Sequence, residues 1–565
     1  MPLPRRPAAT LLRCLVLAIV LVTIPPARAL ASTTQTGWMQ DDPSVLADPM
    51  GTLERMRLLG AEEVRFGVRW YSIAPNINSH RAPRGFNGSN PASYRAAAWA
   101  PLDAIVRDAH AVGIGLDLDL MGGTPLWATG PNPPHDGKVH YNWEPSPSLY
   151  GQFVRAVATR YSGNYDPGLR KTKPGDPNDL PRVNFWSIWN EPDYGPSLAP
   201  QGLPSNLRID YAPDQYRHLL DAAWGALQAT GHGRDTIVFG EVAPRGQSYW
   251  GVFSGMTPLL FLRSLYCVDS RYHQLRGSAA AVRGCPTTAA GSRAFRAAHP
   301  ALFQASGFSD HPYMRWYPPN HEVNPDPTNH LSTADYTSLG VIGQLERALD
   351  RLQGVYGSHA RFPIYDTEFS YITSPPKHDT SQTPWVSPAT AAYYINWAEY
   401  LSWRDRRMQS FDQYLLYDPL PALKSNDWGQ FASGLLTYGR HLPKADYSAY
   451  RLPLYLPVTS TRRGRSLEVW GCVRPARFAL EDSSTPVPQT AAIQFQQGTS
   501  GQWTTLQTVT ITNPNNCYFD VRVAFPASGS VRLVWSYPAL DPMLGNFAAD
   551  QSHPVYSRYV AIAIR

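Results

Sequence analysis

The first 450 residues alternate between two hydrophobic periods. Short apolar or alternating runs, typical of strands, are followed by amphipathic segments with the spacing of helices. The runs that predict strands are 35–40, 63–70, 114–121, 184–189, 236–239, 308–313, 362–369 and 410–417. The segments that predict helices are 44–60, 99–112, 148–161, 213–229, 334–356 and 388–406. Alternating units of this kind predict a parallel sheet, and eight strands can close a (β/α)8 TIM barrel.

The pattern changes after residue 450. Short strands rich in Val, Thr and Phe recur between turn residues, and no strong helix is predicted. The predicted strands are 466–470, 490–496, 503–511, 517–524, 530–536 and 558–564. We therefore expect a barrel over residues 32–450 and an all-β sandwich domain over residues 451–565. Trp470, Trp503 and Trp535 of that domain fit either its core or a glycan-binding platform.

The first 31 residues have the pattern of a signal peptide. Arg5 and Arg6 precede an apolar run over residues 11–24, and Ala29-Leu30-Ala31 provides a small-residue cleavage site. The run is short for a membrane span, and no later run is long enough. We expect an exported protein that begins near Ser32 and has no membrane span.

The charge argues against nucleic-acid binding, and the cysteine spacing argues against a metal site. The formal net charge falls from +6 to +2 when the four arginines of residues 1–31 are removed, and no basic tract interleaved with aromatics predicts nucleic-acid binding. Four cysteines follow the signal peptide, as the local pairs Cys267/Cys285 and Cys472/Cys517. Because no Cys-x-x-Cys spacing occurs, two disulfides are favoured over a metal site.

The most specific motif lies at the end of an aromatic strand, in Trp189-Asn190-Glu191-Pro192. Pro192 cannot donate to a sheet ladder, so the strand ends there and holds the Glu191 carboxyl at its rim, where a general acid can act. The motif resembles the acid/base motif of the clan A glycoside hydrolases, which are retaining enzymes on a (β/α)8 barrel. Trp143-Glu144-Pro145 has no apolar strand before it and predicts a loop or helix start.

A retaining glycosidase needs a second carboxylate, roughly 5–5.5 Å from the first. Active sites of such barrels lie at the C-terminal ends of the strands. Glu368 ends the predicted strand 362–369, which is the seventh in order, whereas Glu191 ends the fourth. Clan A enzymes carry their nucleophile and acid/base on these same two strands. Asp366, on the same face but deeper in the barrel, is the alternative nucleophile.

The resemblance extends to four further positions. It implies that Arg65, on the second strand, supports the nucleophile, and that Asn190 binds the sugar 2-hydroxyl. It also implies that Tyr313, in His311-Pro312-Tyr313, hydrogen-bonds the nucleophile, with His311 beside it. The residues alone leave a second reading of His311, as a core histidine bonded to a carbonyl.

Alternation over residues 63–70 places Arg65, Gly67 and Arg69 on the inward face. Two inward cations require anionic partners. These partners are either catalytic carboxylates or the acidic groups of inter-strand ion pairs without a chemical role.

Three predicted sugar contacts are less specific. Many clan A enzymes place a Trp at the end of the eighth strand as a floor for the sugar, whereas this chain has Tyr417 there and Trp428 a little later. Glu241, at the end of the fifth strand, is expected either to bind a sugar hydroxyl or to pair with Arg245.

The order of signal peptide, barrel and sandwich is most similar to glycoside hydrolase family 39 and its relatives. This resemblance implies a secreted retaining glycosidase that acts on an oligo- or polysaccharide of plant or bacterial cell walls and needs no metal or organic cofactor. Family 39 relatives include β-xylosidases and enzymes that release arabinose-containing sugars, which favours a substrate containing these sugars. A transglycosylase and a non-catalytic carbohydrate-binding protein on the same barrel are the alternatives.

Overall fold

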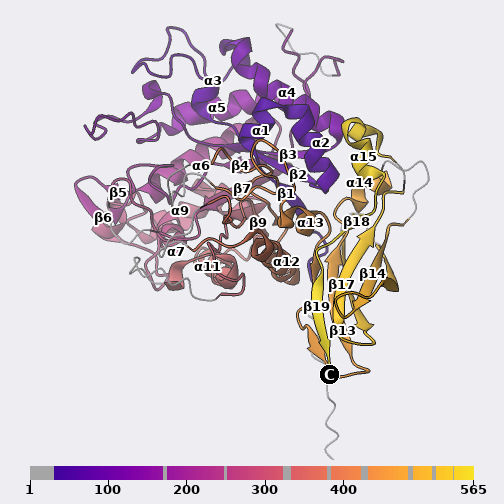
Figure 1. Cartoon of the computed structure of the whole chain (residues 1–565). Coiled ribbons are helices and arrows are strands. Elements are labelled where there is room, and N and C mark those ends of the chain that lie inside the picture. The colour runs from indigo at the N-terminus through magenta and orange to yellow at the C-terminus, as the bar shows by residue number, and fades with distance from the viewer. Residues whose placement is uncertain are drawn as a thin grey trace, which may run out of the picture.

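The computed structural model describes residues 31–565 except 169–174, 247–250, 322–332, 378–383, 422–430, 482–487, 512–516 and 539. The predicted signal peptide lies outside the described residues apart from Ala31. Figure 1 shows a large part built of helices and strands, followed by a narrower part of strands at the C-terminal end of the chain. None of the described helices is long and apolar enough to cross a membrane.

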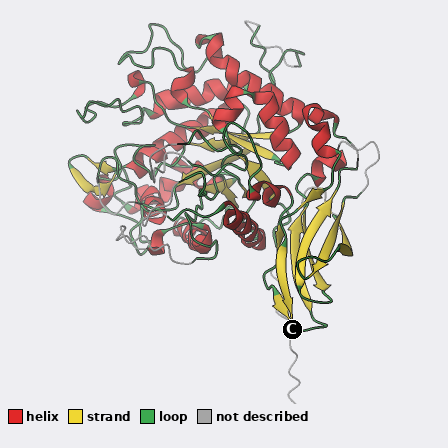
Figure 2. Ribbon diagram, viewed as in Figure 1, coloured by secondary structure: helices red, strands yellow, loops and turns green. Residues whose placement is uncertain are grey.

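Eight strands of the described residues form a parallel barrel, so the predicted TIM-barrel fold is confirmed. The order around the sheet is β10-β1-β2-β3-β4-β7-β8-β9, and a parallel bridge between Ile364 and Met408 joins its two ends. The bounds are β1 Thr36–Met39, β2 Glu63–Gly67, β3 Gly115–Leu120, β4 Phe185–Ile188, β7 Thr236–Val242, β8 Gly307–Asp310, β9 Ile364–Asp366 and β10 Ser410–Phe411. Helices surround these strands (Figure 2).

The helices follow the predicted order with shifted bounds. They are α1 Asp42–Ala47, α2 Pro49–Leu59, α3 Trp70–Ile73, α4 Ala96–Val112, α5 Pro147–Arg160, α6 Ala212–Ala229, α7 Pro258–Leu265, α8 Gly277–Ala281, α9 Ala289–Ala298, α10 Ala301–Gln304, α11 Ile342–Val355, α12 Pro388–Arg404 and α13 Ala445–Arg451. The helix predicted over 44–60 is divided because the Asp48 side chain caps the backbone of Gly51 and Pro49 starts α2.

Helices α3, α7, α8, α9, α10 and α13 were not predicted, and two further segments differ from the sequence prediction. The helix predicted over 334–356 is α-helical only from Ile342, after two 3₁₀ turns at Thr333–Asp335 and Leu339–Val341. The loop after β4 contains an unpredicted hairpin of β5 (Gly202–Leu203) and β6 (Asn206–Asp210). Both are local arrangements that hydrophobic periodicity does not report.

The two faces of the barrel strands have different chemistry. On β2, Val64 and Phe66 are buried in the large apolar core that the strands share with the helices. Arg65 points inward and is also buried. Deeper inside, Trp38 of β1 meets Phe185 of β4 with their rings 4.9 Å apart. Because these strands are not neighbours, the contact crosses the barrel, and the polar groups lie nearer its C-terminal end.

The C-terminal part confirms the predicted all-β sandwich. One sheet has the order β11-β13-β16 and the other β12-β19-β17-β14-β15, with β18 paired to β17. The bounds are β11 Leu454–Tyr455, β12 Ser460–Thr461, β13 Ser466–Cys472, β14 Thr490–Gln497, β15 Trp503–Thr510, β16 Tyr518–Ala524, β17 Gly529–Trp535, β18 Val555–Tyr556 and β19 Val560–Ile564. Two short helices that the sequence did not predict, α14 Ala476–Glu481 and α15 Ala548–Gln551, complete it.

Both predicted disulfides are present. Cys267 is bonded to Cys285 in the segment between β7 and β8, and Cys472 is bonded to Cys517 at the edge of the β13–β16 pair. Two of the three sandwich tryptophans belong to cores and not to platforms. Trp470 is fully buried against Tyr400 of α12, and Trp535 donates from inside the sandwich to Gln489.

Candidate active site

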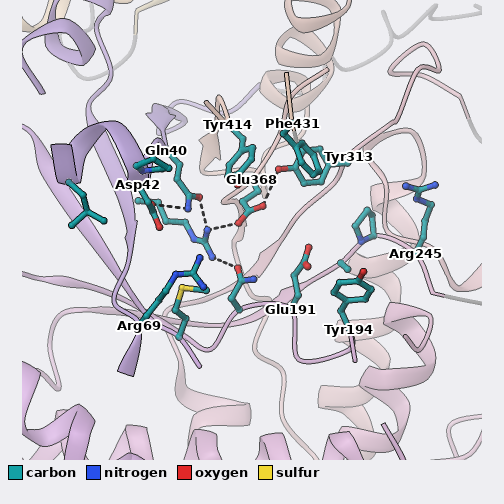
Figure 3. Close-up of a pocket in the computed structure, with 17 residues that line it drawn as sticks. Gln40, Asp42, Arg69, Glu191, Tyr194, Arg245, Tyr313, Glu368, Tyr414 and Phe431 are labelled. Carbon is teal, nitrogen blue, oxygen red and sulfur yellow. Dashed lines mark hydrogen bonds and ion pairs between the residues drawn. The ribbon is translucent and has the colours of Figure 1, made fainter. Parts of the chain in front are cut away.

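The pocket lies where the barrel strands end. Its volume is about 700 Å³, within the usual range for small-molecule sites. Glu191 follows β4 and Glu368 follows β9, so both predicted carboxylates reach it (Figure 3). The lining residues are Gln40, Asp42, Pro43, Leu46, Arg65, Arg69, Met121, Asn190, Glu191, Tyr194, Ala243, Pro244, Arg245, Tyr313, Glu368, Tyr414 and Phe431.

Glu191 is held by an unusual backbone. Its φ is 43° and that of Trp189 is 66°, both in the left-handed region that side chains other than glycine rarely adopt. The Glu191 N–H donates to the carbonyl of Glu241 at 2.8 Å, which ties the end of β4 to that of β7. Strained residues of this kind concentrate at functional sites. Here the strain turns the Glu191 side chain from the apolar strand into the pocket, where it is 21% exposed.

Glu368 is held by a cation and a hydroxyl. Nη1 of Arg65 lies 2.7 Å from its Oε1, and the Tyr313 hydroxyl donates to its Oε2 at 3.0 Å. Both donors are buried, and the Glu368 side chain is 13% exposed. The Arg65 guanidinium therefore stabilises the negative charge of a carboxylate that still faces the pocket.

The distance between the two carboxylates distinguishes two kinds of glycosidase. An oxygen of Glu191, an oxygen of Glu368 and a ring nitrogen of His311 all lie within 4.8 Å of one another. Retaining enzymes hold their carboxyl groups roughly 5–5.5 Å apart, and inverting enzymes roughly 6.5–9.5 Å apart. The observed distance leaves no room for a water between carboxylate and sugar, so it matches the retaining arrangement.

Arg65 joins the two strands that lead to Glu191 and Glu368. Besides Glu368, its guanidinium contacts Gln40 at 2.6 Å, Asn190 at 2.8 Å, Glu241 at 2.8 Å and Asp119 at 3.0 Å. The contact with Asn190 fixes the amide beside Glu191. Burial raises the pKa of Glu241, but Arg65 and the hydrogen bond from His311 outweigh it and lower that pKa to about 2.

His311 links two carboxylates. Nδ1 lies 3.1 Å from Oε1 of Glu191, and Nε2 lies 2.9 Å from Oε2 of Glu241. Burial alone would lower the pKa of His311, but the carboxylates of Glu368, Glu191 and Glu241 hold it well above its usual value. Both ring nitrogens therefore donate, and the reading of His311 as a core histidine bonded to a carbonyl is wrong.

Two predicted sugar contacts lie behind the pocket wall. Glu241 and His311 are fully buried and are not lining residues. Glu241 pairs with Arg65 and His311, and accepts from Thr367 at 3.0 Å, instead of pairing with Arg245. Both expectations for Glu241 are corrected, because an irregularity near the end of β7, where Glu241 has a φ of 48°, directs its side chain into the barrel and away from the pocket.

The predicted floor at the end of the eighth strand is also corrected. Tyr417 is not a lining residue: its ring packs on His441 at 4.4 Å and its N–H donates to Asp41. Trp428 lies outside the described residues. Tyr414 lines the pocket instead, with its ring 5.4 Å from that of Phe431.

Several lining residues were missed by the sequence analysis. Tyr414 was detectable, because it shares its alternation with Ser410, the first residue of β10. Gln40 and Asp42 follow β1, and Gln40 Nε2 donates to Asp42 at 3.2 Å. Their sequence carries no motif, and only the pairing of β1 with β2 brings them beside Arg65.

The alternative nucleophile lies too deep. Asp366 is buried, its Oδ2 accepts the N–H of Asp412, and it does not line the pocket. Burial holds its pKa well above the usual value, with repulsion from Asp412 adding to the effect. A neutral, buried acid is a poor nucleophile, so the geometry favours Glu368.

No protein-family model matches the chain, and no curated protein matches it. Several solved structures are similar to the chain. A family 39 glycoside hydrolase from the gut symbiont Bacteroides cellulosilyticus is 14% identical with a TM-score of 0.41, over 88% of this chain and 82% of that one. A family 51 α-L-arabinofuranosidase from Bifidobacterium longum is 12% identical with a TM-score of 0.38, over 87% of this chain and 95% of that one.

A β-glucuronidase from Bacteroides uniformis is 11% identical with a TM-score of 0.36; the match covers 94% of this chain but only 46% of that protein. The similar structures are glycoside hydrolases, and one of them belongs to family 39. What the pocket does is argued from its own residues.

Glu191, His311 and Glu368 are also close enough together to be considered as ligands of a metal ion. Their contacts favour another role. Arg65 and Tyr313 already hold both oxygens of Glu368, and both ring nitrogens of His311 donate to carboxylates. A protonated imidazole has no lone pair for a metal. The arrangement instead suits two carboxyl groups that act on the two atoms of one substrate bond.

Proposed function

We propose that the protein is a secreted retaining glycoside hydrolase that cleaves O-glycosidic bonds of a plant or bacterial cell-wall glycan. The observation that carries the proposal is the pair Glu191 and Glu368, with oxygens within 4.8 Å at the mouth of a TIM barrel. The two disulfides agree with an exported protein. The preference for a xylose- or arabinose-containing glycan rests on the sequence resemblance.

In the first step, Glu191 acts as the general acid. Oε1 of Glu191 accepts a hydrogen bond from His311, and Oε2 of Glu191 makes no hydrogen bond to any described residue. Oε2 therefore carries the proton toward the pocket. An oxygen of Glu368 attacks the anomeric carbon while the bond from that carbon to the glycosidic oxygen breaks. The leaving oxygen takes the bonding electrons and the proton of Glu191. The product is a glycosyl ester of Glu368.

In the second step, Glu191 acts as the base. It takes a proton from a water whose oxygen attacks the anomeric carbon, and the ester bond to Glu368 breaks. Arg65 and Tyr313 stabilise the carboxylate that leaves, since both contact it directly. Two inversions give net retention of configuration.

A matched set of variants tests the assignment. The substrate is first found with residues 32–565 and a panel of aryl glycosides and cell-wall polysaccharides. Glu191→Gln is expected to lower kcat by about 10²- to 10⁴-fold on polysaccharide, and Glu368→Gln by at least as much. Glu144→Gln is the control, because Trp143-Glu144-Pro145 repeats the local motif, including a φ of 42° at Glu144, outside the pocket.

Proton NMR of the first product formed should show the anomer of the substrate. Full activity of both Glu191→Gln and Glu368→Gln, or an inverted first product, would refute the mechanism. Products longer than the substrate would assign transglycosylation to the same residues, since both reactions use the same glycosyl-enzyme.

A further inference from the structure

Arg69 is an inward cation that the proposed chemistry does not use. It follows β2 by two residues and shares the inward alternation of Arg65 and Gly67. Arg69 is exposed and lines the pocket. Figure 3 shows the Arg69 side chain pointing into the pocket, on the side where Asp42 and Gln40 lie.

The Arg69 guanidinium is not held by a carboxylate through a hydrogen bond or ion pair among the described residues. Arg65 forms ion pairs with Glu368, Glu241 and Asp119. The Arg69 side chain makes no hydrogen bond or ion pair within the described part of the chain. Asp42 is the nearest acidic candidate. Its oxygens accept instead from Gln40 Nε2 and the N–H of Gly67, each at 3.2 Å.

Because Gly67 has no side chain, it leaves room for Asp42 and Met121 beside Arg69. A Cβ on Gly67 would lie 2.5 Å from Sδ of Met121 and 2.8 Å from Oδ2 of Asp42. Asp42 and Met121 therefore occupy the space that a side chain at position 67, between the two arginines, would need. The Arg69 side chain extends into the open part of the pocket. Its charge faces the substrate space.

The other charges of the pocket do not balance Arg69. Glu191 is protonated when it acts as the acid, and Arg65 neutralises Glu368. Burial raises the pKa of Asp42, and the charges of Arg65 and Arg69 act against this. Arg69 therefore presents a positive charge to the pocket, and a positive cleft concentrates anions.

Resting on the proposed function, we propose that Arg69 binds an acidic substituent of the glycan, either the carboxylate of a uronic acid or a sulfate ester. The planar guanidinium matches both groups through two parallel hydrogen bonds. The acidic group lies on the sugar units held beside Asp42 and Gln40, where no protein carboxylate pairs with Arg69. Arg69 is thus a residue that determines specificity and takes no part in proton transfer.

Matched pairs of substrates test this inference through activity. The pairs are 4-nitrophenyl glucuronides with glucosides, and galacturonides with galactosides, each in both anomers. The wild type is expected to prefer the acidic member. Arg69→Gln should lower the acidic-to-neutral ratio of kcat/KM by about 10- to 100-fold, the loss of a charged hydrogen-bonded pair, and Arg69→Lys should restore part of it. Arg107→Gln, on the exposed face of α4, controls for net charge.

A binding assay tests the same inference without turnover. Glu368→Gln protein is titrated calorimetrically with oligogalacturonides and their carboxyl-reduced forms, and with sulfated oligosaccharides and their desulfated forms. One acidic form should bind at least about 10-fold more tightly than its neutral form, and Arg69→Gln should remove that difference. The arm that responds tells a carboxylate from a sulfate.

The outcomes separate the two proposals. Equal use and equal binding of acidic and neutral partners, or an acidic preference that survives Arg69→Gln, overturns the inference and leaves the glycosidase intact. Binding of acidic glycans through Arg69 without cleavage of any substrate overturns the glycosidase and supports the inference. Failure to bind or cleave any acidic member also overturns the inference.

Discussion

The guanidinium of Arg65 contacts Glu368 at 2.7 Å and is itself fully enclosed by the barrel. A buried cation cannot turn away to water, so the carboxylate it holds keeps one position. Arg65 also contacts Glu241 and Asp119 from behind, which fixes the guanidinium in turn. One residue therefore supports both the site and the barrel core.

Replacing Arg65 should damage stability and activity together. Arg65→Gln leaves Glu241 and Asp119 buried without their cation, and breaking a buried pair costs about 3–5 kcal/mol. We expect that loss in the free energy of unfolding, measured by urea titration, with a fall in kcat of at least about 100-fold. Arg107→Gln should change neither. A fully stable Arg65→Gln protein would show that Arg65 does not support the core.

Removing the Tyr313 hydroxyl should lower activity without lowering stability. Tyr313→Phe removes the hydroxyl that donates to Glu368 at 3.0 Å and keeps the ring that packs on Phe431. Loss of one hydrogen bond to a charged group should lower kcat/KM by about 10- to 100-fold. The melting temperature should stay within about 2 °C of the wild type, because the packing is unchanged. Unaltered kcat/KM would remove Tyr313 from the catalytic group.

Glu241 and His311 predict opposite pH dependences of stability. The pKa of Glu241 is about 2 in the folded protein against an ordinary 4.5, so its contribution is complete above about pH 4.5 and is lost as the pH falls toward 2. The pKa of His311 is held well above 6.5 when folded. Its contribution is complete below about pH 6.5 and is lost as the pH rises through the raised value. Together they stabilise most between pH 4.5 and 6.5.

Urea titrations from pH 3 to 9 check this window. Glu241→Gln should lose about 3 kcal/mol relative to the wild type at pH 6, and the difference should shrink below pH 4.5. His311→Gln should differ most below pH 6.5 and least at pH 9. Differences that are constant across the whole range would contradict the assigned charges.

The sequence was sufficient for the architecture because the barrel depends on repeated local patterns. The alternation of Val64 and Phe66 with Arg65 correctly placed the apolar side against the helices and the cation inside. Strand ends were less predictable. The last predicted strand ran to Tyr417, but the ladder of β10 ends at Phe411, and beyond it an isolated bridge joins Tyr414 to Gln40. Tyr417 therefore faces His441, and Tyr414 lines the pocket.

Contacts between distant strands were the part of the site that the sequence could not supply. The motifs located Glu191 and Glu368, since each ends an apolar run. The direction of the Glu241 side chain depends on a positive φ of 48° inside β7, which cannot be predicted from a glutamate in the sequence. Likewise, the pairing of His311 with two carboxylates requires β4, β7 and β8 to be adjacent, and this is known only once the sheet is ordered.

The two disulfides should differ in their contribution to stability. Cys472 and Cys517 are 45 residues apart, and Cys267 and Cys285 are 18 apart. Constraining the longer loop removes more entropy from the unfolded chain, about 4 kcal/mol against about 3. Urea titrations of the two double-alanine variants should show the larger loss for the Cys472/Cys517 pair. The reverse order would show that effects in the folded state dominate.

The junction between barrel and sandwich is expected to be a source of stability and not a flexible link. Arg474 of the sandwich contacts Glu399 of α12 at 2.5 Å, and both side chains are almost wholly buried. The Tyr518 hydroxyl also donates to Glu399. Removing one partner leaves the other as an unpaired buried charge, so Arg474→Met and Glu399→Gln should each cost about 3–5 kcal/mol.

A double-mutant cycle tests whether the loss belongs to the pair. The Arg474→Met/Glu399→Gln protein leaves no unpaired charge, so its loss in the free energy of unfolding should be well below the sum of the single losses. The exposed pair Arg361 and Asp350 is the control, and Arg361→Gln should cost less than about 1 kcal/mol. Single losses below that value for Arg474→Met and Glu399→Gln would mean that the two domains are held by their apolar contacts, such as Trp470 on Tyr400.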